Sequence, residues 1–202
     1  MIRLVVEKYF EDLFTSGGTR DWGDILNCVH PVVSNEANVD LCSQITDQEV
    51  KDAVFQMEGT KALGPDDFPS IFYHSYLQTI YNDVHGFVAD FLRGNTSPMP
   101  LNLTHIALIP KIPNPESVSH FRPIGLCNFS YKILSKIMAN RLQPHMSNII
   151  SSSQNAFIPR RQIQDNLIIA HEIFHYLKLK KSKKHFNLGV KLDMNKAYDR
   201  VE

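Results

Sequence analysis

The apolar residues of this chain recur every three or four positions in several stretches, and that spacing predicts amphipathic helices with one face in a core. One stretch opens with Thr46 and Glu49, which can form a capping box in which each side chain satisfies a backbone amide of the other residue. Gly94 is expected to end another helix. The predicted helices lie at about 9–14, 46–57, 70–92, 129–142 and 163–177.

Two shorter stretches have the pattern of strands. Residues 105–109 are apolar on both faces, end at Pro110 and present Lys111 in the loop that follows. Residues 188–192 alternate apolar side chains with small or charged ones, so one strand face is apolar and Asp193 stands where the strand ends. A carboxylate in that position can bind a cation.

The composition is that of a soluble globular protein, with 43% hydrophobic and 21% charged residues. No apolar run approaches the roughly 20 residues that span a bilayer, and the first residues do not resemble a signal peptide, so no membrane partner is expected. The cysteines are odd in number and widely spaced, which argues against a disulfide framework or a cysteine zinc cluster. We expect a reducing, intracellular location, nuclear or cytoplasmic.

The formal net charge is zero, but the charges are unevenly distributed. Residues 1–60 hold 4 Lys and Arg against 11 Asp and Glu, whereas residues 151–202 hold 10 against 5. Five of the latter cations are lysines within residues 178–184. The excess predicts a phosphate-binding surface towards the carboxyl end, with a solvated loop or a nuclear import signal as the alternative interpretations.

Several motifs follow one another in a characteristic order. They are Lys-Ala-Leu-Gly-Pro-Asp-Asp at 61–67, Leu-Ile-Pro-Lys at 108–111, Phe-Arg-Pro-Ile-Gly-Leu-Cys-Asn at 121–128, Gln-Asn-Ala-Phe-Ile-Pro-Arg-Arg at 154–161 and Lys-Leu-Asp-Met-Asn-Lys-Ala-Tyr-Asp-Arg-Val-Glu at 191–202. In this order they resemble the reverse transcriptases of plant LINE-type, non-LTR retrotransposons. The last of them resembles the first palm motif of these polymerases.

The resemblance implies an α+β fold, namely the fingers and partial palm of a right-hand polymerase, rich in helices and with an incomplete sheet. It divides the chain into a lead-in segment, 1–45, and a partial reverse transcriptase domain, 46–202. The sequence stops before the Asp-Asp motif that supplies the remaining catalytic carboxylates in the family, so we expect the chain alone to be inactive. A non-catalytic remnant that binds nucleic acid is the alternative.

The resemblance also implies roles for individual residues. Asp193 would be the catalytic carboxylate and the ligand of Mg²⁺, which in the family's complete domain bridges the primer 3′-hydroxyl and the incoming triphosphate. The motifs at 108–111 and 121–128 would form the fingers hairpin, whose Lys111 and Arg122 would face that triphosphate. Tyr198 would crowd a ribose 2′-hydroxyl. The implied partners are an RNA template, a DNA primer and a deoxynucleoside triphosphate. No tightly bound metal is expected in the chain alone.

Nucleic-acid contacts are expected at the carboxyl end. Arg161 stands on an arginine of the family motif. The predicted contacts with the nucleic-acid backbone are Lys180, Lys181, Lys183 and Lys184. Asp67 stands where the family has glycine, and if that turn needs a left-handed backbone, aspartate costs roughly 1 kcal/mol there. Arg160 also replaces a glycine of the family motif.

A competing motif lies on the predicted helix at 163–177. His171-Glu-Ile-Phe-His175 matches the HExxH pattern of zinc metalloproteases. Such an enzyme also needs a third protein ligand and an open coordination position. The two histidines lie one step off the apolar stripe, beside the charged face, where histidines commonly pack at the boundary of a core. Zinc proteolysis is therefore a remote alternative.

Overall fold

The computed structural model describes residues 2–18, 21–97, 99–180 and 187–192. The chain divides into two compact units. Residues 33–146 form the first, here called the hairpin unit, and residues 1–32 with 147–202 form the second, here called the split unit. The predicted domain boundary between residues 45 and 46 falls inside the hairpin unit and stays a prediction.

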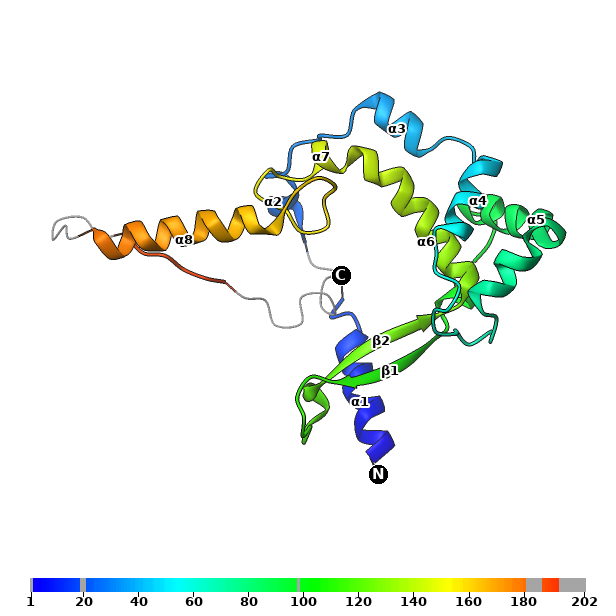
Figure 1. Ribbon diagram of the computed structural model, residues 1–202, viewed down its shortest axis with the longest axis horizontal. Helices are drawn as coiled ribbons and strands as arrows, with labels where there is room; N and C mark the ends of the chain where they lie inside the picture. The colour runs from blue at the N-terminus through cyan, green and yellow to red at the C-terminus, as the bar shows by residue number, and fades with distance from the viewer. Residues whose placement is uncertain (1, 19–20, 98, 181–186, 193–202) are drawn as a thin grey trace. The chain divides into compact units, whose positions relative to one another are not determined.

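The hairpin unit combines helices with an antiparallel pair of strands (Figure 1). Its elements are α3 (Asn35–Leu41), α4 (Asp47–Phe55), α5 (Ser70–Leu92), η1 (Met99–Asn102), β1 (Thr104–Pro110), η2 (Val118–His120), β2 (Phe121–Cys127), α6 (Phe129–Leu142) and η3 (Gln143–His145). The helices predicted at 46–57, 70–92 and 129–142 and the strand at 105–109 are confirmed, and Gly94 follows α5 with a φ of +77°. The pattern does not predict α3, because this short helix buries no residue.

Helix α4 begins where the sequence places a capping box. The Thr46 amide donates to the Glu49 carboxylate over 2.8 Å, and the Glu49 amide donates to the Thr46 hydroxyl over 3.3 Å. Amides at the start of a helix have no partner within the helix, so these two bonds fix where α4 begins.

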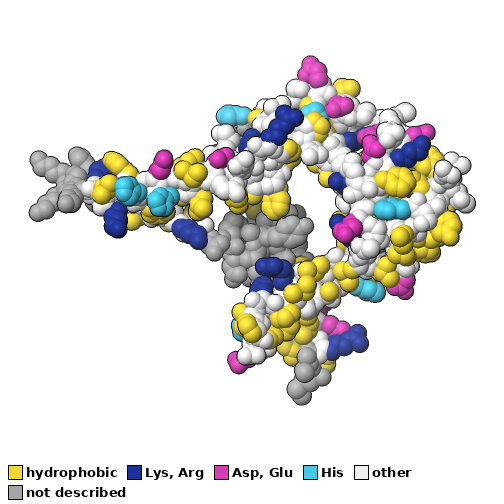
Figure 2. Space-filling view, viewed as in Figure 1, with side chains coloured by type: hydrophobic (Ala, Val, Ile, Leu, Met, Phe, Trp, Pro, Cys, Tyr) yellow, Lys and Arg dark blue, Asp and Glu magenta, His cyan; other side chains and the backbone are white. Residues whose placement is uncertain are grey.

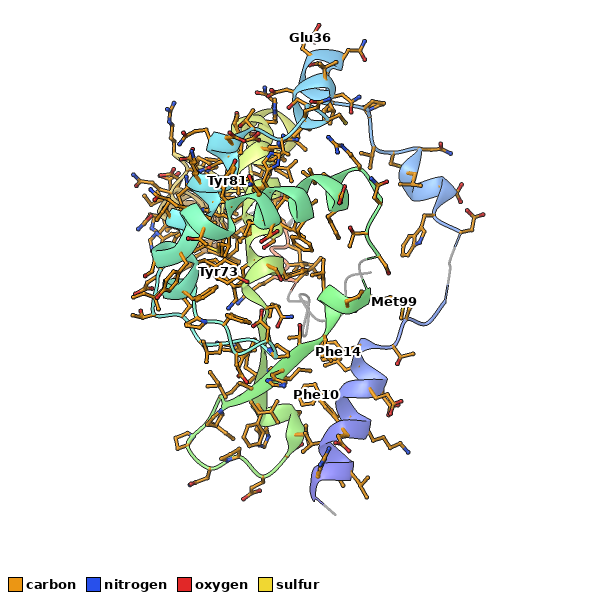
Figure 3. The ribbon with its side chains drawn as sticks, turned by 90° about the vertical axis from the view of Figure 1, so that its right-hand side faces the viewer. Phe10, Phe14, Glu36, Tyr73, Tyr81 and Met99 are labelled. Carbon is orange, nitrogen blue, oxygen red and sulfur yellow. The ribbon has the colours of Figure 1, made fainter. Side chains whose placement is uncertain are left out.

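The core of the hairpin unit lies between α4, α5 and α6. Val50 and Val54 of α4 and Val88 of α5 have no exposed surface. Tyr73 of α5, labelled in Figure 3, packs on Phe129 of α6 with ring centroids 4.4 Å apart. Complete burial of side chains of this size contributes about 1.5–3 kcal/mol each, so contacts among the three helices are the main source of stability in this unit.

Strands β1 and β2 form a regular hairpin. They pair from Thr104 opposite Cys127 to Pro110 opposite Phe121, and the pairing continues because the Lys111 amide donates to the His120 carbonyl over 2.7 Å. Isolated two-stranded sheets are marginally stable, so the hairpin depends on what holds its base.

The turn at 61–67 packs against that base. A Cβ atom on Gly64 would lie 2.5 Å from both the Cys127 carbonyl carbon and the Asn128 nitrogen, so only glycine fits. Beside it, the Asp66 amide donates to the Asn128 side-chain oxygen over 3.2 Å. The turn and the end of β2 therefore interlock through their backbones.

The split unit contains four short or medium helices among its described residues. They are α1 (Ile2–Phe14), α2 (Gly23–Leu26), α7 (Met146–Ile149), which starts at the last residue of the hairpin unit, and α8 (Ile163–Leu179). The helix predicted at 9–14 is the end of α1. No helix in the described ranges has the length and apolar character that crossing a bilayer requires.

Two predictions for this unit are wrong. The apolar stripe at 163–177 predicts a core-facing helix, yet no residue of α8 is buried, and hydrophobic side chains line its exposed length (Figure 2). Residues 188–192 are predicted as a strand, but 187–192 form no strand, and Leu192 is 87% exposed. The spacing of apolar residues shows only that a segment has an apolar face. Burial of that face, or pairing of a strand, needs a partner segment that the described residues do not supply.

Candidate nucleotide and nucleic-acid interface

Lys111 and Arg122 both lie at the loop end of the hairpin. Arg122 is the second residue of β2 and pairs with Ile109 of β1. Lys111 directly follows β1, and its amide donates to the His120 carbonyl at the start of β2. The hairpin thus brings both predicted triphosphate ligands to its loop end.

Both cations are exposed and available to an anion. The Lys111 ammonium donates to the Ser119 carbonyl over 3.3 Å, and within the described ranges neither Lys111 nor Arg122 forms an ion pair. A lysine supplies a compact charge, and an arginine can donate to two oxygens at fixed geometry. Together they have the chemistry to hold two parts of one phosphate chain.

Arg161 holds the loop between α7 and α8 together. Its Nη1 donates to the carbonyls of Ser151 over 2.5 Å and Gln154 over 2.7 Å, and its Nη2 donates to those of Ser147 and Ile150 over 3.2 Å each. Carbonyls at the end of a helix lack partners within it, so the guanidinium satisfies groups that would otherwise need water. This is a role in shaping the loop, and the predicted contact of Arg161 with nucleic acid stays a prediction.

The same loop presents an aromatic ring. Asn155 is 7% exposed and donates to the Gln162 carbonyl over 2.9 Å and to the Asn166 side-chain oxygen over 3.0 Å. Ile158 is 6% exposed. Between these two buried residues, Phe157 is 99% exposed and has a φ of +64°. The loop is therefore anchored on both sides of an exposed ring.

The two positions at which the sequence departs from the family's glycines both have a left-handed backbone. The φ angle is 55° at Asp67 and 66° at Arg160. Each position therefore has a backbone conformation suited to glycine, although the residues there are aspartate and arginine.

We expect Arg160→Gly to raise the free energy of unfolding by about 1 kcal/mol, because arginine is strained at positive φ and glycine is not. Asp67→Gly should gain less, since aspartate tolerates this region better. Urea denaturation measures both. The matched control is Arg93→Gly, where φ is −81°, so glycine brings no relief. A loss of stability in Arg160→Gly would contradict the prediction.

Several predicted site residues lie outside the part of the chain that the structure describes. They are Asp193, Tyr198, Lys181, Lys183 and Lys184, and their roles stay predictions. Lys180 is described: its ammonium donates to the Asn187 side-chain oxygen over 3.2 Å and lies 5.7 Å from the centre of the Tyr176 ring.

The described residues do not assemble a metal site. Within those ranges, no group of three or more His, Cys, Asp or Glu side chains could hold a metal ion. His171 and His175 are both exposed on α8, so among these residues the HExxH motif has no third ligand of the kind zinc proteases require. The predicted Mg²⁺ ligand, Asp193, lies beyond the described residues.

Sequence reasoning misses Arg141. In the structure its guanidinium donates to both Glu49 carboxylate oxygens, over 2.6 and 3.2 Å, and to the carbonyls of Leu41, Ser43 and Gln44. Hydrogen bonding from Arg141 lowers the pKa of the Glu49 carboxyl. Because these partners are more than ninety residues away along the chain, no local pattern indicates the contact.

Comparison with known proteins finds a family match over the part of the chain that contains all the predicted site residues. Residues 109–202 match the family model of reverse transcriptase (RNA-dependent DNA polymerase). The match includes β2, α6 and α8, with Lys111 and Arg122 on the hairpin. The class that this part of the chain resembles is therefore the reverse transcriptase domain, here with helices and a small antiparallel sheet.

The chain is also similar to the Transposon TX1 uncharacterized 149 kDa protein of Xenopus laevis. The two are 27% identical over 172 residues, which make up 85% of this chain and 13% of the frog protein. The chain thus spans only a small part of the length of the relative it matches. The two findings together support a reverse transcriptase of a transposable element, in agreement with the sequence motifs.

Proposed function

We propose that this chain is the amino-terminal part, the fingers with the start of the palm, of the RNA-directed DNA polymerase of a LINE-type, non-LTR retrotransposon like those of plants. The observation that carries the proposal is the position of Lys111 and Arg122 at the loop end of one hairpin, within the matched range. In this role the two side chains bind and orient the triphosphate of an incoming deoxynucleotide. An RNA template and a DNA primer are the proposed nucleic-acid partners.

The catalytic part of the proposal belongs to residues beyond the described ranges. Asp193 would hold Mg²⁺, which in a complete domain neutralises charge during in-line attack, and Tyr198 would select against ribose. One carboxylate is too few to hold two hard cations, so the 202-residue chain is proposed to be inactive by itself. The cations proposed to contact the template and primer backbones are Arg161, Lys180, Lys181, Lys183 and Lys184.

Binding of a fluorescent deoxynucleoside triphosphate to the chain tests the hairpin's role. We expect Lys111→Ala and Arg122→Ala each to weaken binding about tenfold, because each removes a charge-assisted hydrogen bond worth roughly 1.5 kcal/mol. Arg122→Lys should recover only part of the loss, because an ammonium cannot donate to two phosphate oxygens in the planar geometry of a guanidinium. Titration followed by fluorescence anisotropy gives the dissociation constants.

Lys51→Ala and Arg93→Ala are the matched controls, since both remove an exposed cation of the hairpin unit that lies off the hairpin. They should leave triphosphate affinity unchanged. Equal losses in the controls would mean that only overall charge matters, and unchanged affinity in both hairpin variants would overturn the proposal.

A further inference from the structure

Phe157 combines two features that folding alone does not favour. Its ring is 99% exposed, so it contributes almost no burial to stability. Its φ of +64° places a bulky residue in the left-handed region, where a side chain with a Cβ atom is strained. Strain of this kind persists where the surrounding structure enforces it, and it is concentrated at sites that meet a ligand.

The surrounding structure does enforce it. On one side of the ring, Asn155 is buried and hydrogen-bonded to Gln162 and Asn166. On the other side, Arg161 donates to four carbonyls of the segment that leads into the loop. The backbone that carries the ring is therefore anchored and loses little freedom when a partner binds, which favours affinity.

The surroundings of the ring indicate what that partner is. Residues 151–154 are Ser-Ser-Ser-Gln and are exposed, and Arg160 is exposed three residues after the ring. No acidic residue occurs from 147 to 164, whereas Arg160 and Arg161 add two positive charges. If the ring inserted into an apolar pocket of a partner protein, further apolar side chains would be expected around the ring. A flat ring among polar side chains and cations instead suits a nucleobase with its phosphate.

We propose that Phe157 is a stacking residue for an unpaired base of single-stranded nucleic acid, with Arg160 placed to contact the adjacent phosphate. The inference rests on the proposed function in taking nucleic acid as the ligand. The inference adds a stacking contact by the face of the aromatic ring to the electrostatic contacts of the proposed function.

Fluorescence anisotropy of the full chain with two labelled single strands of roughly 12 nucleotides tests this, one of thymidines and one of abasic sugar phosphates. Phe157→Ala should weaken binding to the thymidine strand by roughly 5- to 150-fold, the range that loss of one stacked base produces. It should leave binding to the abasic strand unchanged. It should also leave the dependence of affinity on salt unchanged, because no cation is removed.

Two further variants make the result specific. Phe157→Tyr retains an aromatic face and should bind the thymidine strand as the unmodified chain does. Phe55→Ala removes a ring that is 56% exposed in the hairpin unit and should have no effect. Phe157→Ala should not lower the melting temperature, since the ring is hardly buried.

The outcomes separate this inference from the function on which it rests. If the chain binds the thymidine strand in a salt-dependent way and Phe157→Ala binds equally well, the stacking role is wrong and the proposed function stands. An equal loss on the abasic strand also overturns stacking. A loss of self-association without loss of strand binding would assign the ring to a protein partner and overturn it as well. If the chain binds neither strand at low salt, both proposals fail.

Discussion

Replacing Gly64 by alanine is expected to lower the free energy of unfolding by about 3 kcal/mol, the upper part of the usual range for overpacking. The added Cβ would lie 2.5 Å from two backbone atoms of Cys127 and Asn128. Side-chain atoms there could move aside by a change of rotamer. These are backbone atoms at the end of β2 and the N-cap of α6, and they cannot move without moving both elements. Urea denaturation followed by circular dichroism measures the loss.

The chain contains a matched control for this substitution. Gly86 lies inside α5, and a Cβ atom there would meet nothing within 4 Å. Gly86→Ala should therefore raise the free energy of unfolding by about 0.5–1 kcal/mol, because alanine favours a helix over glycine. If Gly64→Ala were tolerated equally well, the turn at 61–67 would not be packed against the hairpin as the structure has it.

Replacing Arg141 by alanine is the second change with a large expected effect, a loss of about 2–3 kcal/mol. The variant leaves the half-buried Glu49 carboxylate without its cation and leaves three carbonyls, of Leu41, Ser43 and Gln44, without their donor. Arg141→Lys should recover little, because an ammonium cannot reach these acceptors together. Lys136→Ala on the same helix is the control and should change stability by less than about 0.5 kcal/mol.

The same contact predicts a dependence of stability on pH. Arg141 lowers the pKa of Glu49 in the folded chain, so near pH 4 the unfolded chain binds more protons than the folded one. The contribution of this carboxylate is therefore complete above the unfolded pKa and is lost as the pH falls through the lowered folded value. Arg141→Ala should flatten this acid limb of the stability curve. An unchanged slope between about pH 5 and pH 3 would show that other carboxylates dominate it.

Helices α4, α5 and α6 of the hairpin unit could be predicted because their signals are local. Thr46 and Glu49 stand three residues apart and cap α4 directly, and the apolar periods of 70–92 and 129–142 correspond to α5 and α6. The resemblance implied the hairpin, and the pairing of β1 with β2 then placed Lys111 and Arg122 at its loop end. Their spacing along the chain does not show that they lie near each other, because the intervening loop determines how β1 and β2 pair.

The predicted burial of the helix at 163–177 and the predicted strand at 188–192 were wrong for the opposite reason. Helix α8 has a clear apolar period and forms as predicted, but its burial depends on a surface outside its own sequence. Residues 188–192 alternate as a strand does, yet a strand exists only when another strand donates and accepts its backbone hydrogen bonds. Apolar periodicity shows which face of a segment can pack or pair, but it does not show which other segment will cover that face.

The sequence by itself determined helices α4, α5 and α6, the class of polymerase that its motifs resemble, and the excess of cations towards the carboxyl end. The tertiary structure alone decided that Arg141 is bound to Glu49, that Gly64 lies against the backbone of β2, and that Phe157 is exposed while its neighbours are buried. Helices and turns follow from interactions within a few residues. These three features depend on contacts between segments brought together by folding, or on the backbone conformation of an anchored loop, and such contacts leave no periodic pattern in the sequence.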